Sequence, residues 1–595
     1  MRELEVIFIN NKNKYFCNIG EQFFLLSEKY IKEVGLTIYS ENKVNIINLQ
    51  DYNILVIVLH DYNKIDDIIQ LFNSVENEKQ VYEFYIIETY ENIYYVKGPQ
   101  ATSAIKRIRE NVPYYLLEIF SDDYGIVSYP SYFDKNDIKT YIEGIYNFDF
   151  PLVYRKNSNR FDCINLVLYP TKKTVRFSEV ILLDESYVAG DTRVKSDRDS
   201  DVVLNSIGEL SPIYDIEKLD EFSDLGYPVY KTYSSRGAFE NIFSVHGGKG
   251  MTDFQSKCSA LGEAYERYSA RLFEYDEQKI ICGSFTSMKQ RNRVLHPESL
   301  VLDVDYNNIF SEKKIFEWVE AYSLTNEKMI YVPANSVFFP YDRDNKLMLH
   351  SQSTTGISAE VSTSRAILQA LLEILERDSY SIVHKALLSV KEIDENTIKD
   401  EKILNTINYL KVRNIRVHLS LISQFDFVYV VHCTLESETF PIFTHGSGAN
   451  LNINIAIKRA IFEAIQMRVS QIELKSNGDS LLKETPFIKW GEGEEEFVKP
   501  FLTKFSSEVI DVSKVIDFST GNIKTDIEFL VSKLKSNNFE VICVNLSRDD
   551  VPLSCVRVIV PGLQDIDNFN GRVTPRLAKI LKEQNRQLNC IELFS

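Results

Sequence analysis

The sequence lacks the features that direct a protein into a membrane, out of the cell or onto a nucleic acid. Its first residues, MRELEVIFINNKNKYF, show no basic region, apolar region or cleavage site of a secretory signal, and no apolar run reaches the length of a membrane span. The formal net charge of −18 argues against nucleic acid as the main partner, because phosphate binding needs a surplus of lysine and arginine. We therefore expect a cytoplasmic protein that binds neither membrane nor nucleic acid.

The sequence also lacks any cysteine spacing typical of a metal site. Its eight cysteines, at positions 17, 163, 258, 282, 433, 543, 555 and 590, form no C-x-x-C pair and no zinc-like group. Free cysteine is often buried, so we expect reduced thiols inside the core. The absence of internal repeats and low-complexity segments argues against a solenoid or a disordered tail.

The length of 595 residues exceeds what one hydrophobic core supports, so two or three domains are expected. In the N-terminal third, residues 54–60 and 81–89 predict strands, and residues 64–78 have apolar side chains at helical spacing. This order predicts a parallel crossover and an α/β fold. A polar stretch from about residue 185 to 215 predicts a boundary between a domain at 1–185 and a second domain at 190–595.

Three later segments each have a polar or Gly-rich lead before a helix that mixes apolar residues with carboxylates: 252–273, 363–387 and 454–474. In the first, Thr252 and Gln255 predict a capping box just after the GGKG turn. Ser259, Glu263 and Glu266 then share one helical face. Like charges at this spacing weaken a helix by roughly a few tenths of a kcal/mol per pair, and a bound cation would reverse that sign.

The second helix places Glu373 and Glu376 at i and i+3, with Arg377 beside them. Apolar neighbours predict that this helix is largely buried, so its carboxylates need partners. In the third helix, one face carries Arg459, Glu463, Gln466 and Ser470. The helical period of about 3.6 residues points Arg468 roughly opposite to Gln466.

Two helices thus contribute four carboxylates to a predicted site: Glu263, Glu266, Glu373 and Glu376. Such oxygen ligands hold Mg²⁺ when water and nucleotide phosphates complete its shell. Lys249, in the Gly-rich turn, is a candidate for contacting phosphate. The alternative for each helix alone is a solvated Glu face with incidental Arg pairs, but the three helices together favour a binding site.

Four sequence blocks resemble the YcaO superfamily, in particular its azoline-forming cyclodehydratases. GGKGMTDFQSKCSALGEAYERYSARLF (247–273) resembles the first nucleotide-binding segment, and TGISAEVSTSRAILQALLEILERDSY (355–380) resembles a glycine-containing lead and its helix. RAIFEAIQMR (459–468) resembles the R-A-x-x-E-x-x-Q-x-R helix, and VRVIVPGL (556–563) resembles a late strand. The blocks follow the family's order over roughly residues 190–595.

The resemblance implies an ATP-binding fold whose helices surround the nucleotide and its Mg²⁺ ions. It assigns the metals to Glu263, Glu266, Glu373 and Glu376, and nucleotide binding to Lys249, Ser259, Arg377, Glu463, Gln466 and Arg468. Lys195 and Arg198 are further candidates for contacting phosphate. No catalytic residue is assigned. His246 and His445 are interpreted as structural or loop residues, because nothing in the sequence pairs them with a nucleophile.

The chemistry implied for the family is ATP-dependent activation of a peptide backbone amide. A nucleophile adds to the carbonyl carbon, the resulting oxyanion takes a phosphoryl group from ATP, and phosphate leaves. When a neighbouring Cys, Ser or Thr is the nucleophile, the product is a thiazoline or an oxazoline. The resemblance implies a precursor peptide with a leader as substrate, and a flavin-dependent azoline dehydrogenase, other synthetase subunits and a second copy of the chain as candidate partners.

Residues 93–111, IYYVKGPQATSAIKRIREN, resemble the late part of the ThiF-like fold that accompanies many azoline-forming enzymes. The missing C-x-x-C pairs do not support a zinc staple, and residues 1–60 contain no Gly-rich phosphate loop. We interpret residues 1–185 as a reduced ThiF-like partner domain or a leader-peptide-binding domain. The alternative is an unrelated α/β domain.

Three hypotheses for function follow. The first is a cyclodehydratase that forms azoline rings in a ribosomally made, bacteriocin-like peptide. Azoline-forming members commonly end in Pro-x-Pro, whereas this chain ends QLNCIELFS, which fits the second hypothesis, formation of a thioamide or an amidine. The third is a non-catalytic scaffold subunit that presents the precursor. Buried carboxylates lower stability when they are unpaired, so the four glutamates favour an enzyme.

Overall fold

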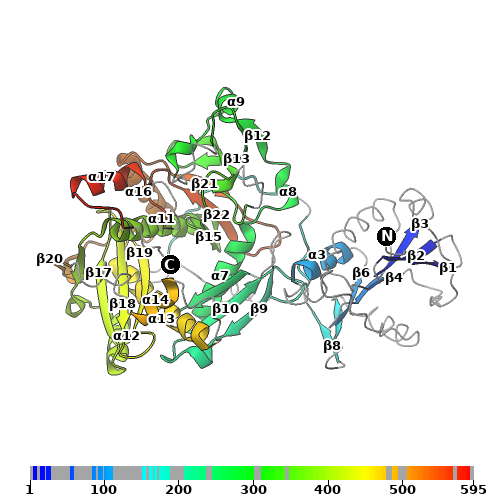
Figure 1. The fold of residues 1–595 in the computed structure, drawn as a ribbon, viewed down its shortest axis with the longest axis horizontal. Coiled ribbons are helices and arrows are strands. Elements are labelled where there is room, and N and C mark those ends of the chain that lie inside the picture. Colours follow the sequence, from blue (N-terminus) through cyan, green and yellow to red (C-terminus); the bar gives the residue numbers. More distant parts are fainter. Residues whose placement is uncertain are drawn as a thin grey trace. The chain divides into compact units, whose positions relative to one another are not determined.

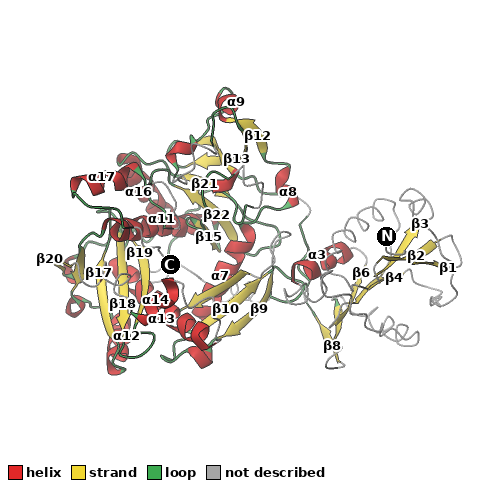
Figure 2. Cartoon of the chain, in the orientation of Figure 1, coloured by secondary structure: helices red, strands yellow, loops and turns green. Residues whose placement is uncertain are grey.

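The computed structural model of the protein describes residues 5–9, 14–19, 22–27, 54–58, 84–88, 92–97, 100–111, 151–155, 158, 160–164, 166–170, 173–187, 207–235, 244–300, 310–341, 348–476, 486–493, 501, 505–566 and 573–589. Within these residues the chain mixes helices and strands throughout, as Figure 2 shows, which confirms the predicted mixed α/β class. None of the helices described there is both long enough and apolar enough to cross a membrane.

The chain forms two compact units. The N-terminal unit comprises Met1–Pro170, Leu204–Asp215 and Tyr233–Ser244, and the C-terminal unit comprises Thr171–Val203, Ile216–Thr232 and Val245–Ser595. Residues 173–187 pack as part of the C-terminal unit. The Asn545 amide donates to the Phe177 carbonyl at 2.7 Å, and the Ile523 amide donates to the Glu185 carbonyl at 2.8 Å. The division at 185–190 stays a prediction.

The described strands at 5–27 and 54–163 of the N-terminal unit form two separate sheets. Three antiparallel strands form the first: β1 (Glu5–Ile9), β2 (Lys14–Ile19) and β3 (Gln22–Ser27). The second has the order β4 (Ile54–Val58), β5 (Phe84–Glu88), β6 (Asn92–Lys97), β7 (Leu152–Arg155), β8 (Arg160–Cys163), and helix α3 (Ala101–Asn111) follows β6. Strands β4 and β5 pair in parallel, which confirms the predicted crossover, while its helix at 64–78 lies outside the described residues.

The described residues of the C-terminal unit form two larger sheets. One has the order β12 (Ile281–Ser284), β13 (Ile315–Ser323), β21 (Ile542–Asn545), β22 (Ser554–Ile559), β15 (Ile357–Glu360), with β14 (Lys328–Pro333) paired to β13. The other has the order β19 (Phe443–Asn450), β18 (Tyr429–Glu436), β17 (Arg416–Leu421), β16 (Val390–Ile393), β20 (Phe505–Ile510). A small sheet joins β9 (Ile213–Lys218), β10 (Val229–Ser234) and β11 (Ser244–Lys249).

Three long helices pack on these sheets, and all three lie where the sequence predicts them (Figure 1): α7 (Asp253–Ser269), α11 (Thr363–Ala386) and α13 (Ile453–Ser476). The shorter helices of this unit are α8 (Glu274–Glu277), α9 (Phe285–Lys289), α12 (Glu401–Val412), α14 (Pro486–Glu492), α16 (Ile523–Ser536) and α17 (Pro575–Glu583). Thr252 caps α7 by accepting from the Gln255 amide at 3.2 Å. The Gln255 side chain accepts from Met251, one residue before the position that a capping box predicts.

Helix α11 is the centre of the C-terminal core. It contacts one large sheet through β15 and β22 and the other through β19, and its apolar side chains, such as Leu371 and Leu375, are fully buried. The helix therefore holds Glu373 and Glu376 at a point where both sheets meet it. Helix α13 lies directly on β19, because Gly446 and Gly448 have no side chain. A Cβ at these positions would lie 2.4 Å from the Ala464 amide nitrogen and 2.4 Å from the Ala456 carbonyl oxygen.

The cysteines whose side chains are described are free thiols, as predicted. Cys433, Cys543 and Cys555 are buried, whereas Cys163 and Cys282 are exposed, so the prediction of buried thiols is wrong for these two. Both lie in short strands of four residues, β8 and β12, in which every side chain is exposed or half-buried.

Candidate active site

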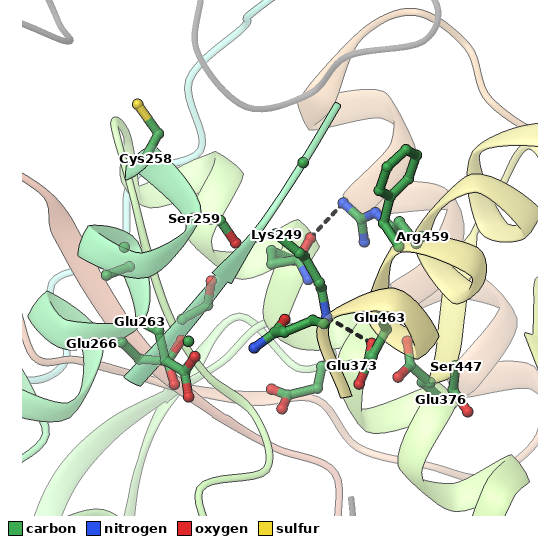
Figure 3. A pocket seen from close by; sticks show the side chains of 18 of the residues that line it. Lys249, Cys258, Ser259, Glu263, Glu266, Glu373, Glu376, Ser447, Arg459 and Glu463 are labelled. Carbon is green, nitrogen blue, oxygen red and sulfur yellow. Dashed lines mark hydrogen bonds and ion pairs between the residues drawn. The ribbon is translucent and has the colours of Figure 1, made fainter. Parts of the chain in front are cut away.

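A cavity of about 650 Å³ lies in the C-terminal unit, between α7, α11 and α13. Figure 3 shows its charged side chains, which come from all three helices and from the end of β11. The predicted site residues that line it are Lys249, Ser259, Glu263, Glu266, Glu373, Glu376, Arg377, Glu463 and Gln466. Helices that are up to about 200 residues apart in the sequence are thus brought to one site, with their polar stripes facing it.

Helix α7 supplies one wall of the cavity. Arg267 Nη1 lies 3.0 Å from Glu266 Oε1, and Arg267 Nη2 lies 3.4 Å from Glu263 Oε1. Burial raises the pKa of Glu266 well above its ordinary value, and Arg267 offsets this only in part because Glu373 adds a second negative charge. This wall therefore holds more negative charge than its own arginine neutralises.

Helix α11 supplies the second wall. Glu373 accepts a hydrogen bond from the Gly356 amide at 3.1 Å and faces Arg377 Nε at 3.7 Å. Burial raises the pKa of Glu373 in spite of these partners. Burial, together with the negative charge of Glu463, raises the pKa of Glu376 to about 7. A bound cation would stabilise the ionised form of all these carboxylates.

Helix α13 completes the cavity with Glu463, whose Oε2 lies 2.8 Å from Lys249 Nζ. Burial alone would raise the pKa of Glu463, but Lys249 and Arg377 hold it below its ordinary value. Gln466 lies one turn further on, against β11, where a Cβ on Gly247 would lie 2.2 Å from its Nε2. The end of β11 therefore contacts the same face of α13 that carries Glu463.

Two arginines of the cavity were not assigned a role from the sequence. Arg267 follows Glu266 directly and lies four residues after Glu263, so the E-x-x-E-R spacing was a usable signal. Arg459 donates to Gln369 Oε1 at 2.7 Å and to the Ala449 carbonyl at 3.3 Å, and it lines the cavity. It shares the predicted stripe with Glu463, whereas its partners belong to other elements.

Arg468 is the one predicted site residue of α13 that does not line the cavity. Its guanidinium pairs with the Asp224 carboxylate at 2.8 Å and donates to the Pro441 carbonyl at 2.9 Å. The helical period explains this position, because Arg468 points away from the face that carries Glu463. Arg468 therefore lies outside the cavity in a pair with Asp224, and the nucleotide-binding role that the motif implies for it stays a prediction. Lys195 and Arg198 lie outside the described residues.

The two histidines considered from the sequence are both buried in strands. His246 lies in β11 with Nδ1 3.9 Å from Glu263 Oε1, and burial lowers its pKa well below the ordinary value. His445 lies in β19, with its ring centroid 4.2 Å from that of Trp490 and 5.8 Å from that of Tyr380. Both are therefore neutral side chains inside strands and not loop residues.

The cavity residues fit a shared magnesium and nucleotide site better than a metal cage made by protein alone. In the part of the chain that the structure describes, no three Asp, Glu, His or Cys side chains converge as a ready metal shell. Mg²⁺ at nucleotide sites usually takes only one or two carboxylates and completes its shell with water and phosphate oxygens. Glu263, Glu266, Glu373 and Glu376 can supply such ligands, and Lys249 and the arginines can face phosphate.

A family profile described as "YcaO cyclodehydratase, ATP- and Mg²⁺-binding" matches residues 247–564, which is more than half of the chain and includes every residue of this cavity except Ile566. The chain belongs to the YcaO family. This confirms the predicted family, and ATP and Mg²⁺ are the ligands of YcaO proteins, as predicted. The ThiF-like assignment of residues 1–185 stays a prediction.

The chain is also similar to a relative of known sequence and to two solved structures. A protein of unassigned function from Methanothermobacter thermautotrophicus is 30% identical over 384 residues, which cover 63% of this chain and 96% of the relative. A structure described as a heterocyclase in complex with substrate and cofactor has a TM-score of 0.73 at 17% identity, covering 95% of this chain and 83% of that one. The heterocyclase TruD has a TM-score of 0.63 at 16% identity, covering 94% and 80%. These two structures share the fold.

Proposed function

We propose that the protein is an ATP- and Mg²⁺-dependent cyclodehydratase that forms azoline rings in a ribosomally made precursor peptide. The observation that carries the proposal is the cavity, where four glutamates from α7 and α11 lie with Lys249 and three arginines in a chain of the YcaO family. An excess of buried carboxylate with raised pKa is typical of a functional site, because it lowers stability unless a ligand neutralises it.

ATP, bound with Mg²⁺, would supply the phosphoryl group that converts the amide oxygen of the peptide into a leaving phosphate. The work left to this chain is positioning and charge neutralisation, since phosphoryl transfer needs little covalent chemistry from the protein. Glu263 and Glu373, on facing walls, would orient the metals, and Arg377 would face the phosphates. The buried apolar side chains of α11, which forms the second wall of the cavity, would keep water away from the reacting groups.

The share of this chain that the heterocyclase structures match supports a peptide substrate. The archaeal relative matches 63% of this chain, whereas the two heterocyclase structures share the fold over 94% or more of it. The N-terminal unit therefore has a counterpart in the heterocyclases, and we assign it the task of binding the leader of the precursor. Strand addition to a sheet of this unit is the mode of leader binding that we propose.

Intact mass spectrometry of a precursor peptide co-expressed with this protein tests the proposal. We expect the loss of one water for each ring, and no loss when Glu373→Gln replaces the wild type. An exchange of oxygen for sulfur would instead establish thioamide formation, the second hypothesis. An unchanged peptide from a protein that also binds no ATP would contradict the proposal and favour the scaffold.

A further inference from the structure

Lys249 differs from the other cations of the cavity in the way it meets its carboxylate. Arg267 lies on α7 with Glu263 and Glu266, and Arg377 lies on α11 with Glu373, so each of these pairs belongs to one helix. Lys249 instead ends β11 and reaches Glu463 on α13, as Figure 3 shows. This ion pair therefore joins two separate elements at the cavity.

The backbone around Lys249 is closely packed. A Cβ on Gly248 would lie 2.1 Å from the Ser256 carbonyl oxygen, and one on Gly250 would lie 2.6 Å from Gln255 Cβ. On the other side, Gly247 is pressed against Gln466. We therefore attribute any change in the position of the Lys249 ammonium group to rotation of its side chain on a closely packed strand.

The side chain itself is able to leave its partner. Lys249 and Glu463 are 24% and 27% exposed, so the pair faces the cavity and is only partly desolvated. A lysine carries a compact, well hydrated charge on a flexible stem, and a partly exposed ion pair of this kind is weak. A triphosphate that enters the cavity offers the ammonium group a stronger partner than one carboxylate.

The position of this ammonium group conflicts with a metal ion at Glu463. Glu463 and Glu376 repel each other, and Lys249 is a positive charge that acts on both carboxylates. A divalent cation placed beside them would stand close to Lys249, and like charges a few ångströms apart repel strongly in a partly buried site. Lys249 and the cation therefore compete for the same carboxylates.

We propose that Lys249 is a mobile counter-ion that holds Glu463 until the triphosphate arrives, so that the cavity excludes a divalent cation without nucleotide and admits it with nucleotide. This inference rests on the nucleotide site proposed above and adds an order to its binding. When Lys249 turns to the phosphates, Glu463 becomes free to support the metal shell. The nucleotide and the cation then bind cooperatively, because each removes an obstacle to the other.

The test measures cation and nucleotide separately on the purified full chain. Free Mn²⁺, used as a probe for Mg²⁺, is counted by electron paramagnetic resonance without nucleotide, and a non-hydrolysable ATP analogue is titrated calorimetrically with a chelator present. For Lys249→Met we expect Mn²⁺ alone to bind about tenfold more tightly and the metal-free analogue to bind about tenfold more weakly. Opposite signs distinguish a counter-ion from a residue that only supports the fold.

Lys458→Met is the matched control. Lys458 also lines the cavity, so its substitution removes one positive charge from the cavity lining and leaves the Lys249 pair intact. We expect both affinities to change less than about threefold, since the remaining effect is long-range and screened. Glu463→Gln is a second variant, which releases Lys249 and is expected to strengthen binding of the metal-free analogue several-fold.

Two results would overturn the inference: unchanged Mn²⁺ affinity in Lys249→Met, or the same gain in Lys458→Met. A wild-type protein that binds no analogue would contradict the proposed function instead. The Mn²⁺ measurement needs no nucleotide, so it decides in that case too whether Lys249 keeps a cation away from Glu463. Thermal unfolding of each variant confirms that the fold is retained.

Discussion

Two clusters of buried charge in the C-terminal unit are built in different ways. In the first, Arg548 and Asp276 are fully buried, and Arg548 Nη1 donates to both Asp276 oxygens at 2.8 and 2.7 Å. Arg548 also donates to the carbonyls of Ser269 and Arg271. In the second, the cavity, Arg267 lies 3.0 Å from Glu266 and 3.4 Å from Glu263, and Arg377 lies 3.7 Å from Glu373.

The difference separates a structural charge from a functional one. Short, bidentate bonds satisfy the Arg548 guanidinium, and the negative charge of Asp276 helps hold the pKa of Arg548 above its ordinary value in spite of burial. In the cavity, burial raises the pKa values of Glu266 and Glu373 in spite of the neighbouring arginines, so the negative charge of these two carboxylates is only partly neutralised. Such incomplete neutralisation is what a site for a cationic ligand needs.

The largest effect is expected from breaking the structural pair. Asp276→Asn removes the charge that faces Arg548 and leaves a buried cation without its counter-charge, which lowers the free energy of unfolding by about 3–5 kcal/mol. Denaturant unfolding of the variant and the wild type measures this difference. A loss below about 1 kcal/mol would show that the pair is no better satisfied than a surface salt bridge.

The matched change in the cavity is expected to affect activity and leave stability intact. Glu266→Gln removes a carboxylate whose ionised form burial already disfavours, so the free energy of unfolding stays equal or rises. ATP-dependent turnover falls by about a hundredfold to a thousandfold, the usual loss when one group that orients or neutralises the transferred charge is removed. A variant that is destabilised like Asp276→Asn would remove the distinction between the two clusters.

A third prediction concerns pH. Burial lowers the pKa of His384 to about 3 and that of His445 to about 4, and it also lowers the pKa of His432 well below its ordinary value. These imidazoles stay neutral in the folded state while the unfolded chain takes up protons below about pH 6.5. The free energy of unfolding therefore falls as pH drops from about 6.5 to 4, by up to about 1.4 kcal/mol per pH unit for each histidine.

The comparison of two variants isolates this effect. His432→Phe keeps a ring beside Phe501, whose centroid lies 4.0 Å away, and removes one titrating group, so the pH dependence of unfolding becomes shallower. Tyr380→Phe changes the same aromatic cluster without removing an imidazole and serves as the control. Equal slopes for His432→Phe and the wild type would show that His432 does not contribute.

The smallest effect on ligand binding is expected at Arg468. Because Arg468 pairs with Asp224 away from the cavity, Arg468→Met lowers stability by about 1–3 kcal/mol and changes the affinity for the ATP analogue less than about threefold. Calorimetric titration beside thermal unfolding measures both. A large loss of affinity with an unchanged unfolding temperature would instead support the nucleotide-binding role that the motif implies for Arg468.

Local sequence signals predicted the helices of the site but not the pairs between them. The stripe of Glu263 and Glu266 on α7 follows from helical spacing alone. The direction of Arg468, away from the helical face that carries Glu463, follows from the same spacing. The pair between Lys249 and Glu463 joins residues 214 positions apart, and only the tertiary fold brings them together. The partner of Arg468, Asp224, is 244 positions away and equally invisible to a local pattern.

The glycines of the fold illustrate the same limit. A sequence marks Gly446 and Gly448 as small residues in a strand, but it does not show that α13 lies against them. The close approach of α13 to β19 determines the position of Glu463 in the cavity. The division of the chain near residue 185 and the task of its N-terminal part stay predictions, because the signals for them are compositional and lie partly outside the described residues.

Calorimetric titration of the wild type, Glu376→Gln and Asp276→Asn with a non-hydrolysable ATP analogue, with and without Mg²⁺, tests the central claim most directly. We expect Mg²⁺-dependent binding to the wild type and to folded Asp276→Asn, and loss of the Mg²⁺-dependent part in Glu376→Gln. Binding that Mg²⁺ does not affect, or that Glu376→Gln leaves unchanged, would contradict the assignment of this cavity as the site for magnesium and ATP.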